Sequence, residues 1–290
     1  MRKYGFFKIF KYAIIFLFCI IITSICSCSS LLKKAEKLSS NIPFNYPGLR
    51  IETKSININE IENYSPRIVC FGDSVTFGWN FKYEYSYPSV LERLLKKDYP
   101  DIKIVNSGIG GNTIIDGNQR FARDVLRYKP ELVIINFGLN DGVLSKISKN
   151  KKIQDDFIYY EDNNKYFYPN VNLKEFEECY ENLLKNINKS QTEILILSIN
   201  PVLDIFPDNQ NENYRRKQRE IYWQYNEKII EIAKNNNINY INLWDIFSNE
   251  VYIKEYIQSD GIHPNKAGFL LIASKVYKEL EESKISMKYK

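Results

Sequence analysis

Short apolar runs alternate with longer stretches of helical periodicity through most of this 290-residue chain, and that alternation limits its fold more than any other feature. The short runs have four to six residues and are rich in Ile or Val, which is typical of strands buried in a sheet. They span residues 67–71, 102–106, 132–137, 194–199 and 240–243.

Between and after these runs, apolar side chains recur every three or four residues, which predicts amphipathic helices at 87–97, 118–128, 173–188, 213–236 and 265–282. Strand and helix alternate five times, so the sequence predicts an α/β fold with a mostly parallel sheet. In such sheets, sites form beyond the carboxyl ends of the strands. In the last helix, a shared buried face is expected for Ala267, Leu271, Ala273, Val276 and Leu280.

Two stretches, residues 142–172 and 201–212, break this rhythm and are predicted to be loops over the strand ends. Two interpretations stay open for the aromatic residues of the first: they form a rim or lid for a substrate, or they pack the insertion down. These aromatic residues are Phe157, Tyr159, Tyr160, Tyr166, Phe167 and Tyr168.

The first 27 residues have the composition of a signal peptide. An uncharged apolar run at 13–22 is followed by small residues at 23–28, and it has about ten residues where a membrane-spanning helix needs roughly 20. We therefore predict a signal peptide at residues 1–27 rather than a permanent transmembrane segment. The basic residues that precede the run are Arg2, Lys3, Lys8 and Lys11.

Residues 25–28, Ile-Cys-Ser-Cys, resemble a bacterial lipobox, in which cleavage precedes a cysteine that then carries lipid. Cys28 is the predicted lipid attachment site, and residues 28–66 the anchor, tether and lead-in segment. The alternative is ordinary cleavage near Ser27, which leaves Cys28 as a free thiol. Both interpretations predict an extracytoplasmic protein, either anchored to a membrane by lipid or secreted.

Removal of residues 1–27 takes away four positive charges and no negative ones, so the formal net charge falls from +5 to +1. The remaining basic residues are scattered, which argues against nucleic-acid binding. After Cys28 only two cysteines follow, Cys70 and Cys179, and Cys70 is predicted to be a buried apolar side chain. With a single His in the chain, a zinc or other transition-metal centre is not predicted.

A hydrolase that works near neutral pH often uses a His side chain as its base, and His263 is the only one here. It lies three residues after Asp260, a spacing that one turn of backbone brings to the same side. Asp260 could then fix the tautomer of His263 and stabilise its protonated form. Such a pair is common at surfaces and helix starts, so it identifies no enzyme by itself.

The candidate nucleophile is Ser74, in the sequence Gly-Asp-Ser-Val-Thr-Phe-Gly directly after the first strand. Backbone N–H groups at such a turn can stabilise an oxyanion, and Gly72 is expected to permit a tight bend. A serine that only caps a helix is the more common case. Thr76 replaces the second glycine of the Gly-x-Ser-x-Gly elbow, which sets aside the ordinary α/β-hydrolase pattern.

Two further polar blocks follow later strands, at residues 106–113 and 136–141. A glycine amide from the first and the Asn140 side chain from the second are suitable donors to an oxyanion, each worth about 3 kcal/mol. The glycine cluster lacks the ending of a P-loop and the spacing of a dinucleotide-binding loop, so nucleotide binding is not predicted.

Ser74, Gly111, Asn140 and the Asp260–His263 pair occur in the order found in the SGNH hydrolases, also called the GDSL esterase/lipase family. Residues 67–282 resemble that family, and residues 283–290 are predicted to form a C-terminal tail. The resemblance implies a flavodoxin-like three-layer α/β/α sandwich with a five-stranded, mostly parallel sheet. It implies no cofactor and no metal.

The resemblance also implies roles for single residues. Ser74 becomes the nucleophile, His263 the base and Asp260 the group that orients the base. The Ser74 amide, the Gly111 amide and the Asn140 side chain become the oxyanion hole. Gly110 stays an alternative to Gly111, because the two glycines are adjacent. The neighbouring carboxylates Asp73 and Asp141 are expected to hold the loops through bonds to backbone amides.

The implied reaction is hydrolysis of a carboxylic ester through an acyl-enzyme. The family acts on lysophospholipids, acyl thioesters, aryl esters and acetylated sugars, so the expected partner is a small-molecule, lipid or acylated-glycan ester. The main interpretation is a lipase-like, lysophospholipase-like or short-chain esterase, and the alternative is a carbohydrate O-acetylesterase. A third class, a catalytically silent surface binding lipoprotein, is disfavoured because every catalytic position is filled.

Overall fold

The computed structural model describes residues 68–146, 160–162, 165–188, 190–207, 210–249 and 252–282. The predicted signal peptide, Cys28, the tether and the C-terminal tail lie outside these ranges. No helix within them has the length and apolar character needed to cross a membrane.

Five parallel strands form the central sheet in the order β2-β1-β3-β7-β8, which is the flavodoxin order and confirms the predicted fold class. All residues of β1 and β3 are buried, as expected for central strands that are covered on both faces. The strands are β1 (Ile68–Gly72), β2 (Ile104–Gly108), β3 (Leu132–Asn136), β7 (Glu193–Leu197) and β8 (Asn239–Ile241).

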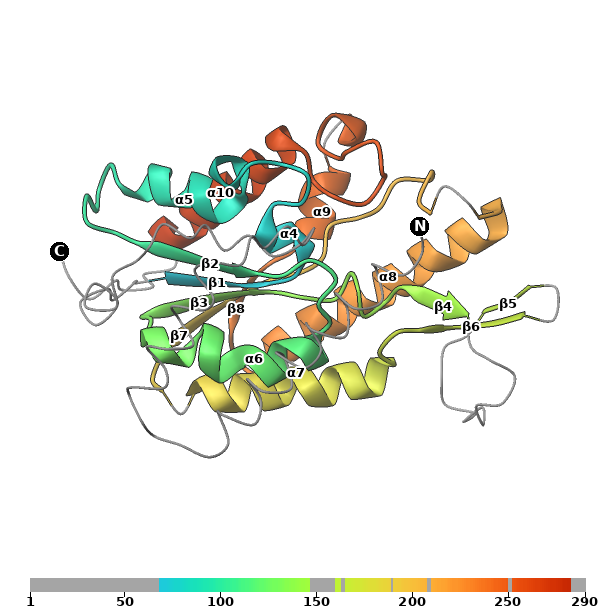
Figure 1. Ribbon diagram of the computed structural model, residues 1–290, viewed down its shortest axis with the longest axis horizontal. Coiled ribbons are helices and arrows are strands. Elements are labelled where there is room, and N and C mark those ends of the chain that lie inside the picture. The colour runs from blue at the N-terminus through green and yellow to red at the C-terminus, as the bar shows by residue number, and fades with distance from the viewer. Residues whose placement is uncertain are drawn as a thin grey trace, which may run out of the picture. The chain divides into compact units, whose positions relative to one another are not determined.

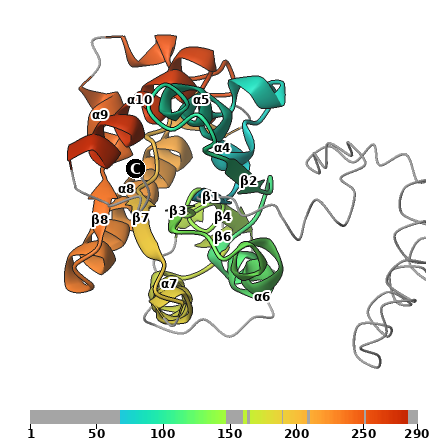
Figure 2. The same cartoon turned by 90° about the vertical axis from the view of Figure 1, so that its left-hand side faces the viewer.

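Helices cover both faces of this sheet, which gives the predicted three layers (Figure 1). On one face α5 packs on α10, and on the other α6 packs on α7, which in turn contacts α8 (Figure 2). These helices are α5 (Tyr87–Leu95), α6 (Ile114–Asp124), α7 (Leu173–Asn188), α8 (Glu212–Asn235) and α10 (Lys266–Glu282). Shorter helical segments are α4 (Ser74–Phe77), η1 (Tyr83–Tyr85), η2 (Leu126–Tyr128), α9 (Leu243–Ser248) and η3 (Ile253–Glu255).

The predicted boundary of the second helix is wrong by four residues, because α6 begins at Ile114 and not at 118. Thr113 and Asp116 form a capping box there: the Thr113 side chain accepts the Asp116 N–H, and the Asp116 side chain accepts the Thr113 N–H. The cap thus starts the helix before its apolar periodicity becomes regular. Leu243 likewise begins α9 and does not end a strand, because Asn242 caps that helix.

The predicted buried face of α10 is partly wrong. Ala267 is exposed and Leu271 only half-buried. The run from Gly268 to Ala273 is apolar on every side, so periodicity alone could not choose its inner face; packing against α5 decided it. The buried residues are Gly268, Phe269, Ile272, Ala273, Val276 and Leu280.

The prediction of a plain loop at 142–172 is also wrong, since three short strands pair there as an antiparallel sheet in the order β4-β6-β5. Phe167 is buried against Tyr214 of α8, with ring centroids 5.1 Å apart, and Tyr214 Oη donates to Leu144 O at 2.6 Å. Among the described aromatic side chains of the insertion, Phe167 and Tyr168 therefore pack it down, while Phe157 and Tyr159 lie outside the described residues. The strands are β4 (Leu144–Lys146), β5 (Tyr160–Asp162) and β6 (Lys165–Pro169).

The second predicted loop is confirmed, because the described residues from Pro201 to Asn211 contain no helix or strand.

Gly72 serves a different purpose from the tight bend predicted for it. A Cβ atom there would lie 2.4 Å from the backbone oxygen of Asn136 and 2.2 Å from the Thr76 hydroxyl. Glycine is required at this position by the close approach of α4 and β3 to the end of β1.

Two buried carboxylates hold the loops that follow β1 and β3, as expected from the sequence. Asp73 caps α4 by accepting the Val75 N–H at 2.9 Å, and Asp141 accepts the Ile114 N–H of α6 at 2.9 Å. Burial raises the pKa of Asp73 to about 6. Burial, and secondarily the charge of Asp73, raise the pKa of Asp141 from 3.8 to about 8, against the opposing effect of the Ile114 hydrogen bond.

The raised pKa of Asp141 predicts a specific pH dependence of stability. Because the folded protein binds this proton more tightly than the unfolded chain, the stabilisation is complete below about pH 4 and is lost as the pH rises to about 8. Asp141→Asn keeps an oxygen for the Ile114 N–H but carries no charge. Its unfolding free energy relative to wild type should therefore rise by at least about 1 kcal/mol between pH 5 and pH 8 in urea titrations.

Asp101→Asn is the control for that experiment, because Asp101 is exposed and hydrated whether the chain is folded or not. It should change the pH dependence far less than Asp141→Asn. Parallel stability curves for Asp141→Asn and wild type would contradict the prediction.

Candidate active site

Ser74 is the first residue of α4, immediately beyond the carboxyl end of β1. Its neighbour Asp73 supplies the helix cap. The first N–H groups of a helix have no partner within the helix, so the Ser74 amide is available to a ligand. Ser74 is 5% exposed, so it is buried and does not lie on open surface.

His263 lies on the segment between α9 and α10, and contacts from the loop that follows β7 hold that segment in place. Asn200 Nδ2 donates to Ile262 O at 2.9 Å, and the Leu203 N–H donates to Gly261 O at 2.8 Å. The Gln258 N–H donates to His263 O, also at 2.8 Å. The backbone carbonyl groups of His263 and of the two residues before it are therefore all held by hydrogen bonds.

These elements bring three predicted residues into one chain of hydrogen bonds. Ser74 Oγ lies 2.9 Å from His263 Nε2, and His263 Nδ1 lies 2.7 Å from Asp260 Oδ2. The other carboxylate oxygen, Asp260 Oδ1, accepts the backbone N–H groups of Ile262 and His263 at 3.0 Å each. Both oxygens of Asp260 are thus used to hold the imidazole and its backbone.

The Asp260 carboxylate is stabilised in its charged form. Partial burial by itself would raise its pKa, but the hydrogen bonds from the His263 ring and from the Ile262 and His263 amides together lower it below 3.8. Asp260 therefore remains an anion at neutral pH, and it can stabilise a positive charge on His263.

Trp79 is a neighbour of the site that the sequence patterns do not indicate. Its ring is stacked on the imidazole of His263, with centroids 5.8 Å apart and an interplanar angle of 28°. Its backbone oxygen accepts Gln258 Nε2 at 3.0 Å, which ties it to the histidine segment. The only local signal is its position directly after Gly78, the glycine that ends α4.

The glycine pair lies in a tight turn after β2, in which the Asn112 N–H donates to Ile109 O at 3.2 Å. Gly111 occupies the third position of this turn with φ +81°, which favours glycine. A Cβ atom on Gly110 would lie 3.9 Å from Ser74 Cβ and 3.0 Å from the Trp79 ring. The turn therefore runs alongside the serine, and of the two glycines Gly111 is the one with a positive φ.

Asn140 follows β3, and its side chain reaches the same turn. Its Nδ2 donates to Asn112 O at 3.0 Å. An amide nitrogen carries two hydrogens, so one remains for a ligand. The Asn140 backbone is held in turn, because Asn170 Nδ2 donates to Asn140 O at 2.8 Å.

The cysteine and acidic side chains in the described ranges form no metal site. Cys70 and Cys179 are free thiols, and burial raises the pKa of Cys70. Within those ranges no group of three or more His, Cys, Asp and Glu side chains could hold a metal ion.

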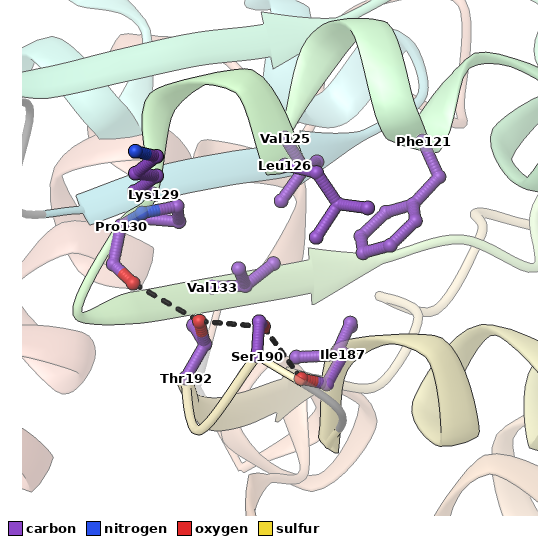
Figure 3. Close-up of a pocket in the computed structure, with 9 residues that line it drawn as sticks. All are labelled: Phe121, Val125, Leu126, Lys129, Pro130, Val133, Ile187, Ser190 and Thr192. Atoms are coloured by element: carbon purple, nitrogen blue, oxygen red, sulfur yellow. Dashed lines mark hydrogen bonds between the residues drawn. The ribbon is translucent and has the colours of Figure 1, made fainter.

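A cavity of about 200 Å³ lies at the other end of the sheet (Figure 3). Phe121, Val133 and Ile187 line it, and its Thr192 hydroxyl donates to Pro130 O at 3.1 Å. Pro130 and Thr192 precede their strands, whereas Ser74 follows one. Because the strands are parallel, this cavity is remote from the serine.

Comparison with known proteins agrees with this geometry. The chain is 25% identical over 207 residues to the uncharacterized lipoprotein YqeF of Bacillus subtilis, covering 67% of this chain and 73% of that protein. It is 26% identical over 199 residues to an acetylxylan esterase of Geobacillus stearothermophilus, covering 67% and 80%. The crystal structure of a lipase/acylhydrolase from Enterococcus faecalis shares the fold, with a TM-score of 0.55 at 20% identity, covering 75% of this chain and 96% of that one.

The family assignment rests on most of the chain. The sequence model of the GDSL-like lipase/acylhydrolase family matches residues 70–270, from β1 into α10. This range includes the serine, the glycine turn, Asn140 and the Asp260–His263 pair. The chain therefore belongs to the GDSL-like lipase/acylhydrolase family and is an enzyme that hydrolyses ester bonds.

Proposed function

We propose that Ser74 is the nucleophile of this esterase, with His263 as its base and Asp260 as the residue that orients the base. The observation that carries the proposal is the continuous hydrogen-bond chain, 2.9 Å from Ser74 Oγ to His263 Nε2 and 2.7 Å from His263 Nδ1 to Asp260 Oδ2. A nucleophile, its base and an orienting carboxylate in this order are what acyl transfer requires.

In the proposed cycle, His263 Nε2 accepts the Ser74 proton while Ser74 Oγ attacks the ester carbonyl carbon. The tetrahedral intermediate collapses, the alcohol leaves with the proton held on His263, and an acyl-enzyme remains. Water then attacks the acyl carbon and gives its proton to His263, which releases the acid and restores the Ser74 hydroxyl. Asp260 keeps the Nδ1 hydrogen in place throughout.

The proposed oxyanion hole consists of the Ser74 amide, the Gly111 amide and the Asn140 side chain. Three features support it: the free amide at the start of α4, the glycine-specific turn beside Ser74, and the spare hydrogen of Asn140 Nδ2. Donors fixed before the reaction stabilise negative charge without having to reorganise.

The proposed substrate is a carboxylic ester of the kind that a lipase-like, lysophospholipase-like or short-chain esterase cleaves. Trp79 offers an apolar ring beside His263 and Gly110, against which an acyl chain can be buried. The second candidate is a carbohydrate O-acetylesterase, which the 26% identity to an acetylxylan esterase favours. A sugar ring could stack on the same tryptophan.

We also propose that the hydrolase domain spans residues 67–282 and is attached to an extracytoplasmic membrane surface through lipid on Cys28. The basic and apolar pattern of residues 1–27 and the Ile-Cys-Ser-Cys sequence support the anchor. Similarity to a lipoprotein of Bacillus subtilis supports it independently. The match of the family model to residues 70–270 supports a domain of about these bounds.

The triad is tested by single substitutions in the purified protein with p-nitrophenyl acetate as substrate. Ser74→Ala and His263→Ala should each lower kcat by at least about 10³-fold, and Asp260→Ala by less, since other groups can partly orient the imidazole. Ser259→Ala, at an exposed serine next to Asp260, should keep wild-type kcat. Wild-type turnover in Ser74→Ala would refute the assignment.

Acyl-chain preference separates the two substrate classes. If an acyl chain is buried against Trp79, kcat/KM should rise from p-nitrophenyl acetate to butyrate, because each buried CH₂ contributes about 0.8 kcal/mol. Acetate release from an acetylated xylo-oligosaccharide should then be slower than butyrate release. The opposite order, with acetate preferred and the glycan the better substrate, would favour the O-acetylesterase.

The anchor is tested by fractionating bacterial cells that produce the full chain. Wild type should sediment with membranes, and Cys28→Ala should move to the soluble extracytoplasmic fraction, because it has no thiol for the lipid. Cys26→Ala, two residues earlier, should stay with the membranes. Cys28→Ala that remains in the membrane fraction would instead indicate an uncleaved apolar segment.

A further inference from the structure

We infer that Arg120 is a positioning residue for the oxyanion hole, and that it acts on Asn140 through Asn112. This inference rests on the proposed function and adds a residue to it. Arg120 contacts neither Ser74 nor His263 by any hydrogen bond in the described part of the chain, and its influence would be transmitted through the glycine turn.

Arg120 lies inside α6 with a side chain that is only 7% exposed. Its Nη2 donates to Gly72 O at 2.8 Å and its Nη1 to Ser107 O at 2.8 Å, so it joins the carboxyl ends of β1 and β2. The guanidinium carbon lies 4.4 Å from the ring centroid of Phe71. These contacts fix the position and plane of the group.

One donor of this fixed group is directed at the turn, since Arg120 Nε donates to Asn112 Oδ1 at 2.7 Å. The backbone oxygen of the same residue, Asn112 O, accepts Asn140 Nδ2 at 3.0 Å. Asn112 thus receives one hydrogen bond on its side chain and one on its carbonyl group. Movement of this residue would displace the Asn140 amide.

The same residue closes the turn that presents Gly111, because the Asn112 N–H donates to Ile109 O. Two of the three proposed oxyanion donors therefore depend on where Asn112 lies. An oxyanion-hole donor stabilises the oxyanion much less when it is misplaced, because it must lie within about 2.7–3.1 Å of the oxygen.

Arg120 also ties two strands together, so loss of activity alone would not distinguish positioning from general stability. Asn112→Ala is the more selective variant, because it removes the oxygen that accepts Arg120 Nε and keeps the carbonyl group that holds Asn140. Arg120 retains its bonds to Gly72 and Ser107 in this variant. Arg120→Lys is the second variant, since one ammonium group cannot replace the planar fork.

Arg123→Lys is the matched control. Arg123 is on the same helix and pairs with the same carboxylate, Asp124, at 2.6 Å, but its side chain is 65% exposed. Any effect that arises only from the shared ion pair with Asp124 would appear in both arginine variants.

The measurements are kcat and KM for p-nitrophenyl acetate, corrected for the fraction of reactive serine by stoichiometric labelling with a fluorophosphonate, together with thermal unfolding. We expect Asn112→Ala and Arg120→Lys to lower kcat about tenfold or more with KM within about twofold of wild type. Arg123→Lys should match wild type. A wild-type kcat in Asn112→Ala would overturn the inference.

A double-mutant cycle tests the route through Asn140. In the Asn140→Ala background, Asn112→Ala should lower kcat by a clearly smaller factor than it does in wild type, because Asn140, one of the two donors that depend on Asn112, is already gone. Full additivity of the two substitutions would refute transmission through Asn140, even if each lowers kcat alone. Failure of the proposed function itself would be recognised separately, by an active Ser74→Ala enzyme.

Discussion

The register of the parallel sheet is the constraint on which the rest of the site depends. Gly72 pairs with Gly108 of β2 on one side and with Asn136 of β3 on the other, so three strands end in one row. The loops that follow them carry Ser74, the glycine turn and Asn140. Because parallel strands present their carboxyl ends at the same edge of the sheet, the strand register alone brings these groups together.

The proposed base comes from a distant part of the chain. His263 is 189 residues away from Ser74, and nothing in local sequence brings the two together. Its segment is positioned by hydrogen bonds from Asn200 and Leu203, in the loop that follows β7, and by an isolated bridge between Ile257 and Pro264. Trp79, five residues after Ser74, stacks on the imidazole and so links the segment that carries Ser74 to the one that carries His263.

Buried polar groups hold the loops of the site, and their burial has an energetic cost. Asp73 and Asp141 are almost fully buried, and burial raises the pKa of both carboxyl groups, to about 6 and about 8. Each accepts a backbone N–H from a helix start, which partly offsets the loss of hydration. The proposed oxyanion donors near Ser74 thus coexist with buried carboxyl groups that lower stability at high pH, a pattern expected at functional sites.

The sequence by itself determined the features that arise from local spacing. Five strand–helix alternations predicted the layers, and the three-residue spacing of Asp260 and His263 predicted a pair that is indeed hydrogen-bonded at 2.7 Å. These two predictions are correct because strand burial, helical periodicity and short-range pairs depend on residues that are close in the chain.

Tertiary structure alone decided what depends on contacts between distant segments. The inner face of α10 was fixed by α5, and the small sheet of the insertion by its packing on Tyr214. The contacts of Trp79 with His263 and of Arg120 with the strand ends have no local signature either. Periodicity shows that a helix or strand will bury one side, but which side and against which partner is set by packing across the whole domain.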